Sequence, residues 1–146
     1  MQDSPSPEQL LSAVARYLRD EAGPALAAAG QGALAYQAKV AANMLDIAGR
    51  QLARAPADEA AELARLQALL GAVPGSLAAL NQRLADQIAS GQLDTDDLAS
   101  DYPGLAEHLW QTTLDKLAVD QPGYDSYRRL RLADPDPALD AIRHKD

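Results

Sequence analysis

The stretch from Leu34 to Arg54 limits the possible folds of this chain more than any other. At about 100° per residue, most of its surface as a helix is apolar. One side carries Leu34, Ala38, Ala41, Leu45, Ala48 and Leu52, flanked by Tyr36, Val40, Met44 and Ile47. Ala35, Ala42 and Gly49 recur every seventh residue on a third side, where another helix could approach closely. We therefore predict an all-α bundle of about five helices with this helix at its centre.

The same helix keeps one narrow polar strip, formed by Lys39, Asn43, Asp46 and Arg50 at spacings of four, three and four. Two interpretations are open. The strip can be a hydrogen-bonding site for a partner or an anionic group, with Arg50 able to make a bidentate contact. Alternatively, it is a solvated edge held by an Asp46–Arg50 pair one turn apart, which the frequency of charged helix faces favours.

Composition excludes several classes of function. The chain has 146 residues, which suits one domain, and no Cys, so disulfides, thiolate nucleophiles and Cys-ligated zinc are excluded. Its two histidines lie far apart in sequence, and we expect neither a metal site nor a cofactor. A net charge of −8 opposes binding to nucleic acid or to an anionic membrane surface. With neither a signal-peptide pattern nor a run of about 20 apolar residues, we expect a cytoplasmic protein.

Turn and capping residues predict where the helices begin and end. Ser6, Pro7 and Gln9 form a helix opening of the capping-box type, and Gly23-Pro24 ends or bends that first helix. Pro56 is expected to stop the central helix near Ala55. A third helix then runs to Gly71, and a fourth from Ser76 to Gly91. Asp101 and Pro103 open a fifth helix, which ends before Pro122-Gly123. We expect one helical domain over residues 1–146, with 124–146 as a partly extended tail in which Leu139 and Ile142 indicate a short helix.

Apolar spacing predicts which faces of these helices are buried. The stripe of the first helix is Leu10, Leu11, Val14, Ala15 and Leu18. The third helix contributes Leu63, Leu66, Leu69 and Leu70, and the fourth contributes Leu77, Leu80, Leu84 and Ile88. The fifth helix is expected to turn Leu105, Leu109, Trp110, Leu114 and Leu117 inward, with Trp110 as a core anchor.

No sequence motif supports catalysis. His108 has Glu107, Asp115 and Lys116 near it in sequence, but the chain contains no nucleophile elbow and no glycine-rich phosphate loop. An isolated helical histidine is more often a surface or core residue than a base. The cluster of Tyr124, Tyr127, Arg128, Arg129 and Arg131 has the composition of a protein contact surface, although a solvated tail is an equal alternative.

Three blocks resemble a bacterial family of small helical domains of unknown function, commonly encoded beside aminoglycoside-phosphotransferase-like kinases and acyl-CoA dehydrogenases. The blocks are KVAANMLDIAGRQL at 39–52, LAALNQRLADQIASGQLD at 77–94 and LWQTTLDKLAVDQPGY at 109–124. The opening PEQLLSAVARYLRDE also fits, so the resemblance covers roughly residues 5–130. The family pattern falls on Ala41, Ala42, Asn43, Arg50, Leu80, Asn81, Leu117, Ala118, Asp120, Pro122 and Tyr124.

The resemblance implies a partner and assigns no catalytic residue. It suggests a non-catalytic accessory or stabilising subunit of a kinase that phosphorylates hydroxyacyl-CoA-type substrates, with an acyl-CoA dehydrogenase as a further candidate partner. A homo-oligomer is also open. The expected contact residues are Lys39, Asn43, Asp46, Arg50, Asn81, Asp120, Tyr124, Tyr127, Arg128, Arg129 and Arg131. The alternative is a small ligand-binding or enzymatic bundle with a polar site around Asn43, Arg50, Asn81 and His108.

Overall fold

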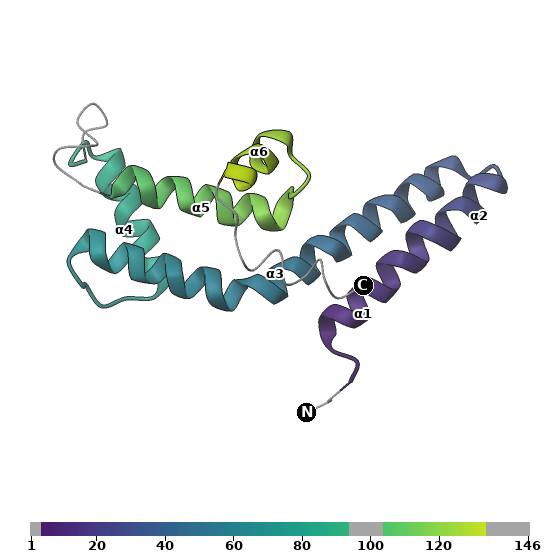
Figure 1. Ribbon diagram of the computed structural model, residues 1–146, viewed down its shortest axis with the longest axis horizontal. Helices are drawn as coiled ribbons and strands as arrows, with labels where there is room; N and C mark the ends of the chain where they lie inside the picture. Colours follow the sequence, from purple (N-terminus) through teal and green to yellow (C-terminus); the bar gives the residue numbers. More distant parts are fainter. Residues whose placement is uncertain (1–3, 94–103, 134–146) are drawn as a thin grey trace.

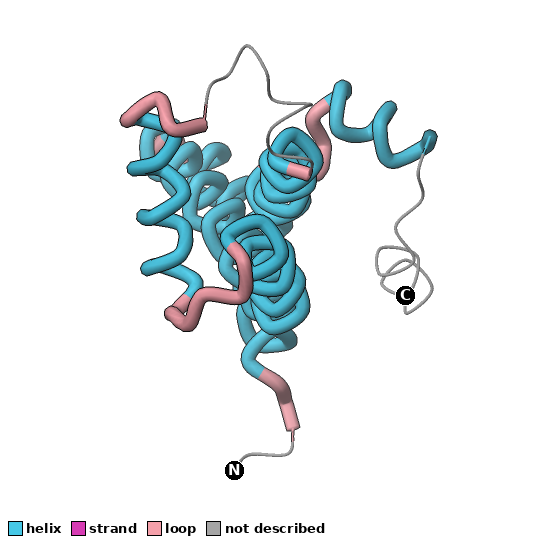
Figure 2. Tube along the Cα trace, turned by 90° about the vertical axis from the view of Figure 1, so that its left-hand side faces the viewer, coloured by secondary structure: helices cyan, strands magenta, loops and turns pink. Residues whose placement is uncertain are grey.

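The computed structural model describes residues 4–93 and 104–133, with side chains up to Leu130. Every regular element among these residues is a helix (Figures 1 and 2), so the predicted all-α class is confirmed. The predicted start of the fifth helix at Asp101 and the predicted terminal helix around Leu139 and Ile142 lie outside the described residues. No described helix is both long and apolar enough to cross a membrane.

Residues 7–28 form one arm of a helical hairpin. Three segments follow one another along this arm: α1 (Pro7–Tyr17), the π-helical η1 (Leu18–Ala22) and α2 (Gly23–Ala28). The chain then turns and returns alongside them as the first half of α3 (Gly32–Leu70), which Figure 1 shows on the right. Gly23-Pro24 was predicted to end or bend the first helix. Helix instead continues through it: the π-helical η1 leads directly into α2, and Pro24 lies in the first turn of α2.

The helix α3 is the longest element, with 39 residues, and it continues through Pro56. The prediction that Pro56 separates two helices was therefore wrong. A proline inside a helix removes one hydrogen bond and bends the axis, and α3 changes direction partway along in Figure 1. Arg54 and Asp58 flank the proline and are ion-paired, with Nε–Oδ2 and Nη2–Oδ1 distances of 3.0 and 3.2 Å. This pair supports the helix at the place where the backbone ladder is weakest.

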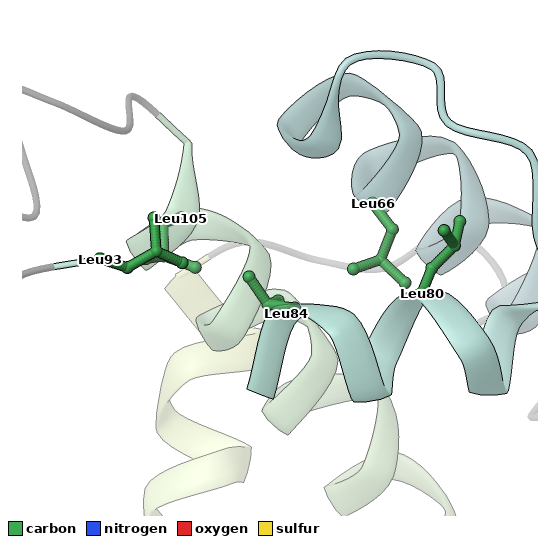
Figure 3. Packing of buried hydrophobic residues seen from close by; sticks show 5 residues of the cluster. All are labelled: Leu66, Leu80, Leu84, Leu93 and Leu105. Atoms are coloured by element: carbon green, nitrogen blue, oxygen red, sulfur yellow. The ribbon is translucent and has the colours of Figure 1, made fainter. Parts of the chain in front are cut away.

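Among the described residues, the cluster of buried leucines lies in the C-terminal half of the molecule, where α4 (Leu77–Ala89) and α5 (Leu105–Asp120) join the second half of α3. Its buried leucines converge from these three helices and from the segment after α4, as Figure 3 shows: Leu66, Leu80, Leu84, Leu93 and Leu105. The predicted inward faces of the third and fourth helices are thus confirmed at Leu66, Leu80 and Leu84.

The inward face of α5 differs from its prediction. Leu105 is buried, but Leu109 and Trp110 are 42% and 48% exposed, so Trp110 is not a core anchor. The buried positions at the other end of this helix are Ala118 and Val119. Beyond it, α6 (Asp125–Ala133) is a helix rather than an extended tail, and Tyr127 buries its side chain to 2% exposure.

The hairpin buries alanines, whereas its leucines, such as Leu11, Leu18 and Leu45, are buried only in part. Its buried apolar residues are Ala15, Ala38 and Ala42, while Leu10 and Val14 of the predicted α1 stripe are about half exposed. Leu34 and Leu52 of the predicted central face are likewise 46% and 50% exposed. Helices that meet through such small side chains approach closely. The longer side chains on either side of the contact, such as Leu10 and Leu34, therefore stay exposed beside the partner helix and do not insert into it.

The predicted helix starts at Ser6 and Ser76 and the predicted helix end at Gly71 agree with the structure. The side chain of Ser6 accepts from the Gln9 N–H while the Gln9 side chain accepts from the Ser6 N–H, which completes the predicted capping box. Ser76 caps α4 by accepting from the Ala79 N–H at 3.3 Å. Gly71 ends α3 in the left-handed region, at φ +80°, where glycine has no steric penalty.

Candidate functional site

An open hollow of about 730 Å³ lies where the connection between α5 and α6 crosses the middle of α3. From α3 it is lined by Asn43, Ile47 and Arg50, and from the connection by residues 120–125. Four predicted contact residues therefore share one surface: Asn43, Arg50, Asp120 and Tyr124. They come from positions about 70 residues apart, and the tertiary fold brings them together.

Arg50 fixes the geometry of this hollow. Its Nε donates to the backbone carbonyl of Val119 at 2.6 Å, close to the C-terminal end of α5. Carbonyls in the last turn of a helix lack intrahelical donors, and a cation there also complements the helix dipole. The guanidinium thus holds the end of α5 against α3, and its other N–H groups have no partner among the described residues.

The polar strip on α3 does not act as one unit. Asp46 pairs with Arg19 of the first arm instead of with Arg50, so the pair expected of a solvated edge is absent from the described ion pairs. Asp46 therefore stabilises the hairpin, and Arg50 ties α3 to α5. Lys39 is exposed and lies outside the hollow, whereas Asn43 is exposed within it. Of the predicted strip, only Asn43 and Arg50 belong to the candidate site.

The tyrosine and arginine cluster is also divided. Tyr124 is 52% exposed at the rim of the hollow, but Tyr127 is buried and serves as the anchor of α6. Arg128 and Arg129 are exposed on α6. The side chain of Arg131 lies outside the described part. Tyr127 was predicted as a contact residue, and its burial removes it from any accessible surface.

Asn81 and His108 lie elsewhere, in a buried polar group between the second half of α3, α4 and α5. The Asn81 amide donates to Glu62 at 2.8 Å, and Arg65 pairs with Asp115 at 3.2 Å. Asn81 therefore faces inward to α3. At about 1.5 Å per residue, Glu62 is roughly 18 Å along α3 from Arg50. The four residues of the predicted enzymatic site do not form one cavity.

His108 is only 2% exposed, and its Nδ1 has no hydrogen-bond partner among the described residues. Burial lowers the pKa of His108 below its ordinary value, with a further lowering from the Arg65 cation and a partial opposing effect of Glu62. The imidazole is therefore neutral at pH 7. Because it is enclosed, it cannot reach a substrate in this conformation.

Several residues of the hollow were absent from the predicted contact set. Ile47 was assigned to the apolar side of its helix, and Gln121, Gly123 and Asp125 were read only as parts of a turn and the tail after it. Pro122 was noted as marking the end of the fifth helix and as part of the family pattern. The available signal was the pattern itself, since Asp120, Pro122 and Tyr124 stand at alternate positions in one connection.

Comparisons with known proteins give a family and no function. No curated protein and no solved structure matches this chain. A family model, described as a domain of unknown function (DUF6285), matches residues 27–124. The matched segment contains every residue that lines the hollow except Asp125, and it excludes α1. This chain therefore belongs to the DUF6285 family.

Proposed function

We propose that this chain is a non-catalytic accessory subunit that binds a protein partner through the hollow between α3 and the α5–α6 connection. The observation that carries the proposal is the convergence of Asn43, Arg50, Asp120 and Tyr124 on that hollow. The class of partner rests on the sequence resemblance described above. It is an aminoglycoside-phosphotransferase-like kinase acting on hydroxyacyl-CoA-type substrates, with an acyl-CoA dehydrogenase as the second candidate.

The chemistry of the hollow suits a protein segment. It offers the N–H groups of Arg50 and Asn43, the carboxylates of Asp120 and Asp125, and the half-exposed ring of Tyr124. Protein interfaces are enriched in tyrosine and arginine, and donors and acceptors of both charge signs favour a partner with complementary groups. A free phosphate or nucleotide would meet two carboxylates there, which disfavours an anionic small molecule.

The alternative, a ligand-binding or enzymatic bundle, receives less support. Its proposed site requires Asn43, Arg50, Asn81 and His108 together, whereas the latter two face a different part of α3. His108 is enclosed, and Asn81 is engaged by Glu62. A catalytic base needs access to the proton that it transfers, and the enclosed imidazole of His108 has no such access here.

Calorimetric titration with an aminoglycoside-phosphotransferase-like kinase of the same cell tests the proposal. Asn43→Ala and Tyr124→Ala remove exposed side chains that make no described hydrogen bond, so the fold should be unchanged. We expect each to weaken the complex by about 2 kcal/mol, as at the centre of an interface. Lys39→Ala is the matched control, because Lys39 is exposed on the same helix outside the hollow.

Arg50→Ala is less informative by itself, since it also removes the hydrogen bond to Val119. Equal binding by the wild type, Asn43→Ala and Tyr124→Ala would remove the hollow from the interface. If the wild type binds neither the kinase nor the dehydrogenase, the accessory role itself is wrong. Turnover of a thioester or phosphoester by the isolated chain, abolished by His108→Ala, would instead establish the enzymatic alternative.

A further inference from the structure

The outer surface of the hairpin carries apolar side chains that nothing in the described structure covers. From α1 these are Leu10, Val14 and Tyr17, which are 48%, 49% and 55% exposed. Their spacing of four and three places them along one side of the helix. From α3 they are Leu34, Met44 and Leu52, which are 46%, 64% and 50% exposed, with the exposed Ala48 between them.

The ion pair between Arg19 and Asp46 shows that both sets lie on the same side of the hairpin. Because these two side chains meet, they mark one common side of the helix pair. At about 100° per residue, Leu10, Val14 and Tyr17 lie roughly 140–180° around their helix from Arg19. Likewise, the exposed apolar residues of α3 lie roughly 120–160° around from Asp46. The hairpin therefore has a mostly polar face, which also carries the 68% exposed Tyr36, and, opposite it, one mostly apolar face to which both arms contribute.

We propose that this apolar face binds the same face of a second copy, so that two hairpins form an antiparallel four-helix bundle. Two helices joined as a hairpin with one shared apolar face are half of such a bundle. A two-fold axis across the face places each arm against an arm of the partner, so the surface only has to be complementary to itself.

Charge favours a second copy over other occupants. Between Pro7 and Arg54 there are five basic side chains (Arg16, Arg19, Lys39, Arg50, Arg54) and four acidic ones (Glu8, Asp20, Glu21, Asp46), a balance of +1. The whole chain has a net charge of −8, so the acidic charge is concentrated outside the hairpin. Two copies can thus approach through the hairpins with little repulsion. An amphipathic helix that lies on an anionic membrane would instead carry an excess of Lys and Arg on its polar face.

The area is also in the range of stable dimers. The six large side chains of this face expose on the order of 600 Å² at the fractions given above, and the small residues between them add to it. Standard protein interfaces bury about 800 Å² per partner, whereas monomers rarely expose contiguous apolar patches above a few hundred Å². This dimerisation is independent of the proposed accessory role, because Asn43 and Arg50 lie on the same side of α3 as Asp46, away from the apolar face.

Sedimentation equilibrium of the full chain between about 1 and 100 µM tests the proposal by mass. We expect the wild type to reach twice the monomer mass. Val14→Glu and Met44→Glu place a carboxylate on the apolar face and should weaken association at least tenfold. Leu109→Glu is the matched control, since Leu109 is a similarly exposed helical leucine outside the hairpin, and it should leave the mass unchanged. Circular dichroism checks that each variant keeps its helices.

The absence of cysteine makes a second, independent measurement possible. Single cysteines at Leu34, Ala41, Ala48 or Leu52 sample the apolar face along α3, and the position nearest the two-fold axis should form a cross-linked dimer under mild oxidation. Lys39→Cys on the polar face should not. A wild type that remains monomeric at 100 µM would overturn the proposal. The proposal would also be wrong if the Val14→Glu and Met44→Glu variants associated as tightly as the wild type. It would likewise be wrong if Leu109→Glu weakened association as much as these two substitutions do.

Discussion

The two halves of this molecule use leucine in opposite ways. Around the second half of α3, leucines from three helices and the segment after α4 are buried against one another. In the hairpin the buried apolar residues are three alanines, while Leu10, Leu34 and Leu52 face outward. The same apolar periodicity therefore gives a closed core where several helices converge, and an uncovered face where only two do.

The energetic consequence of this difference is large. A fully buried leucine contributes about 1.5–3 kcal/mol relative to an exposed one, and an alanine contributes much less because it has only one methyl group. The C-terminal half is thus stabilised chiefly by its leucine core. The hairpin relies on helix contacts, the capping box, the Arg19–Asp46 pair and whatever covers its apolar face.

Leu66→Ala should produce the largest loss of stability in this comparison. Leu66 is fully buried, so its truncation leaves a cavity and should lower the free energy of unfolding by about 2–5 kcal/mol. Leu52→Ala, at a half-exposed position of the same helix, is the control and should cost less than about 1 kcal/mol in the dilute monomer. Urea unfolding measures both. Equal losses would mean that the two halves do not differ in packing as described.

Ala42→Leu tests the packing between the two arms of the hairpin by enlarging a buried side chain, whereas the previous substitution made one smaller. Ala42 is fully buried between the two arms, and a larger side chain would force them apart, at a cost of about 1–3 kcal/mol. The same substitution at the exposed Ala48 adds no such clash, and its effect should stay within about 0.5 kcal/mol. Thermal unfolding followed by circular dichroism compares the two variants. An Ala42→Leu variant as stable as the wild type would contradict close packing of the arms.

His108 should make the free energy of unfolding of the C-terminal half depend on acidic pH. We expect this effect to be smaller than those of Leu66→Ala and Ala42→Leu. Burial and Arg65 lower its pKa in the folded chain, so below pH 6.5 the unfolded chain takes up the proton first. Stability contributed by His108 is therefore complete above pH 6.5 and falls as the pH drops toward the folded pKa.

His108→Leu isolates this contribution, because the carboxylates and His144 are common to both proteins. At pH 7.5 the substitution should be nearly neutral, since it replaces a buried imidazole whose Nδ1 has no described partner. Urea unfolding at pH 7.5 and 5.5 should show a smaller acid loss in His108→Leu than in the wild type. An identical loss in both would show that His108 is not kept neutral by its surroundings.

The sequence by itself determined the features that depend on neighbouring residues. Ser6 and Ser76 cap helices, and Gly71 ends one, because the hydrogen bonds and backbone angles involved lie within a few residues. Leu66, Leu80 and Leu84 were predicted correctly because α4 and the part of α3 after Pro56 each have a single narrow apolar stripe. The helix Leu34 to Arg54 was also predicted, but its wide apolar arc could not specify which part of it would be buried.

Tertiary structure decided the remainder, because it depends on residues far apart in the chain. Alanine contacts between α1 and α3 turned Leu10 and Val14 outward, and the packing of α5 left Trp110 exposed. Helix continues through Pro56, where Arg54 and Asp58 pair across it. The hollow is lined by Arg50, which bonds to the carbonyl of Val119, 69 residues away. Spacing along one helix can align polar groups, but it carries no information about which distant carbonyl or carboxylate will meet them.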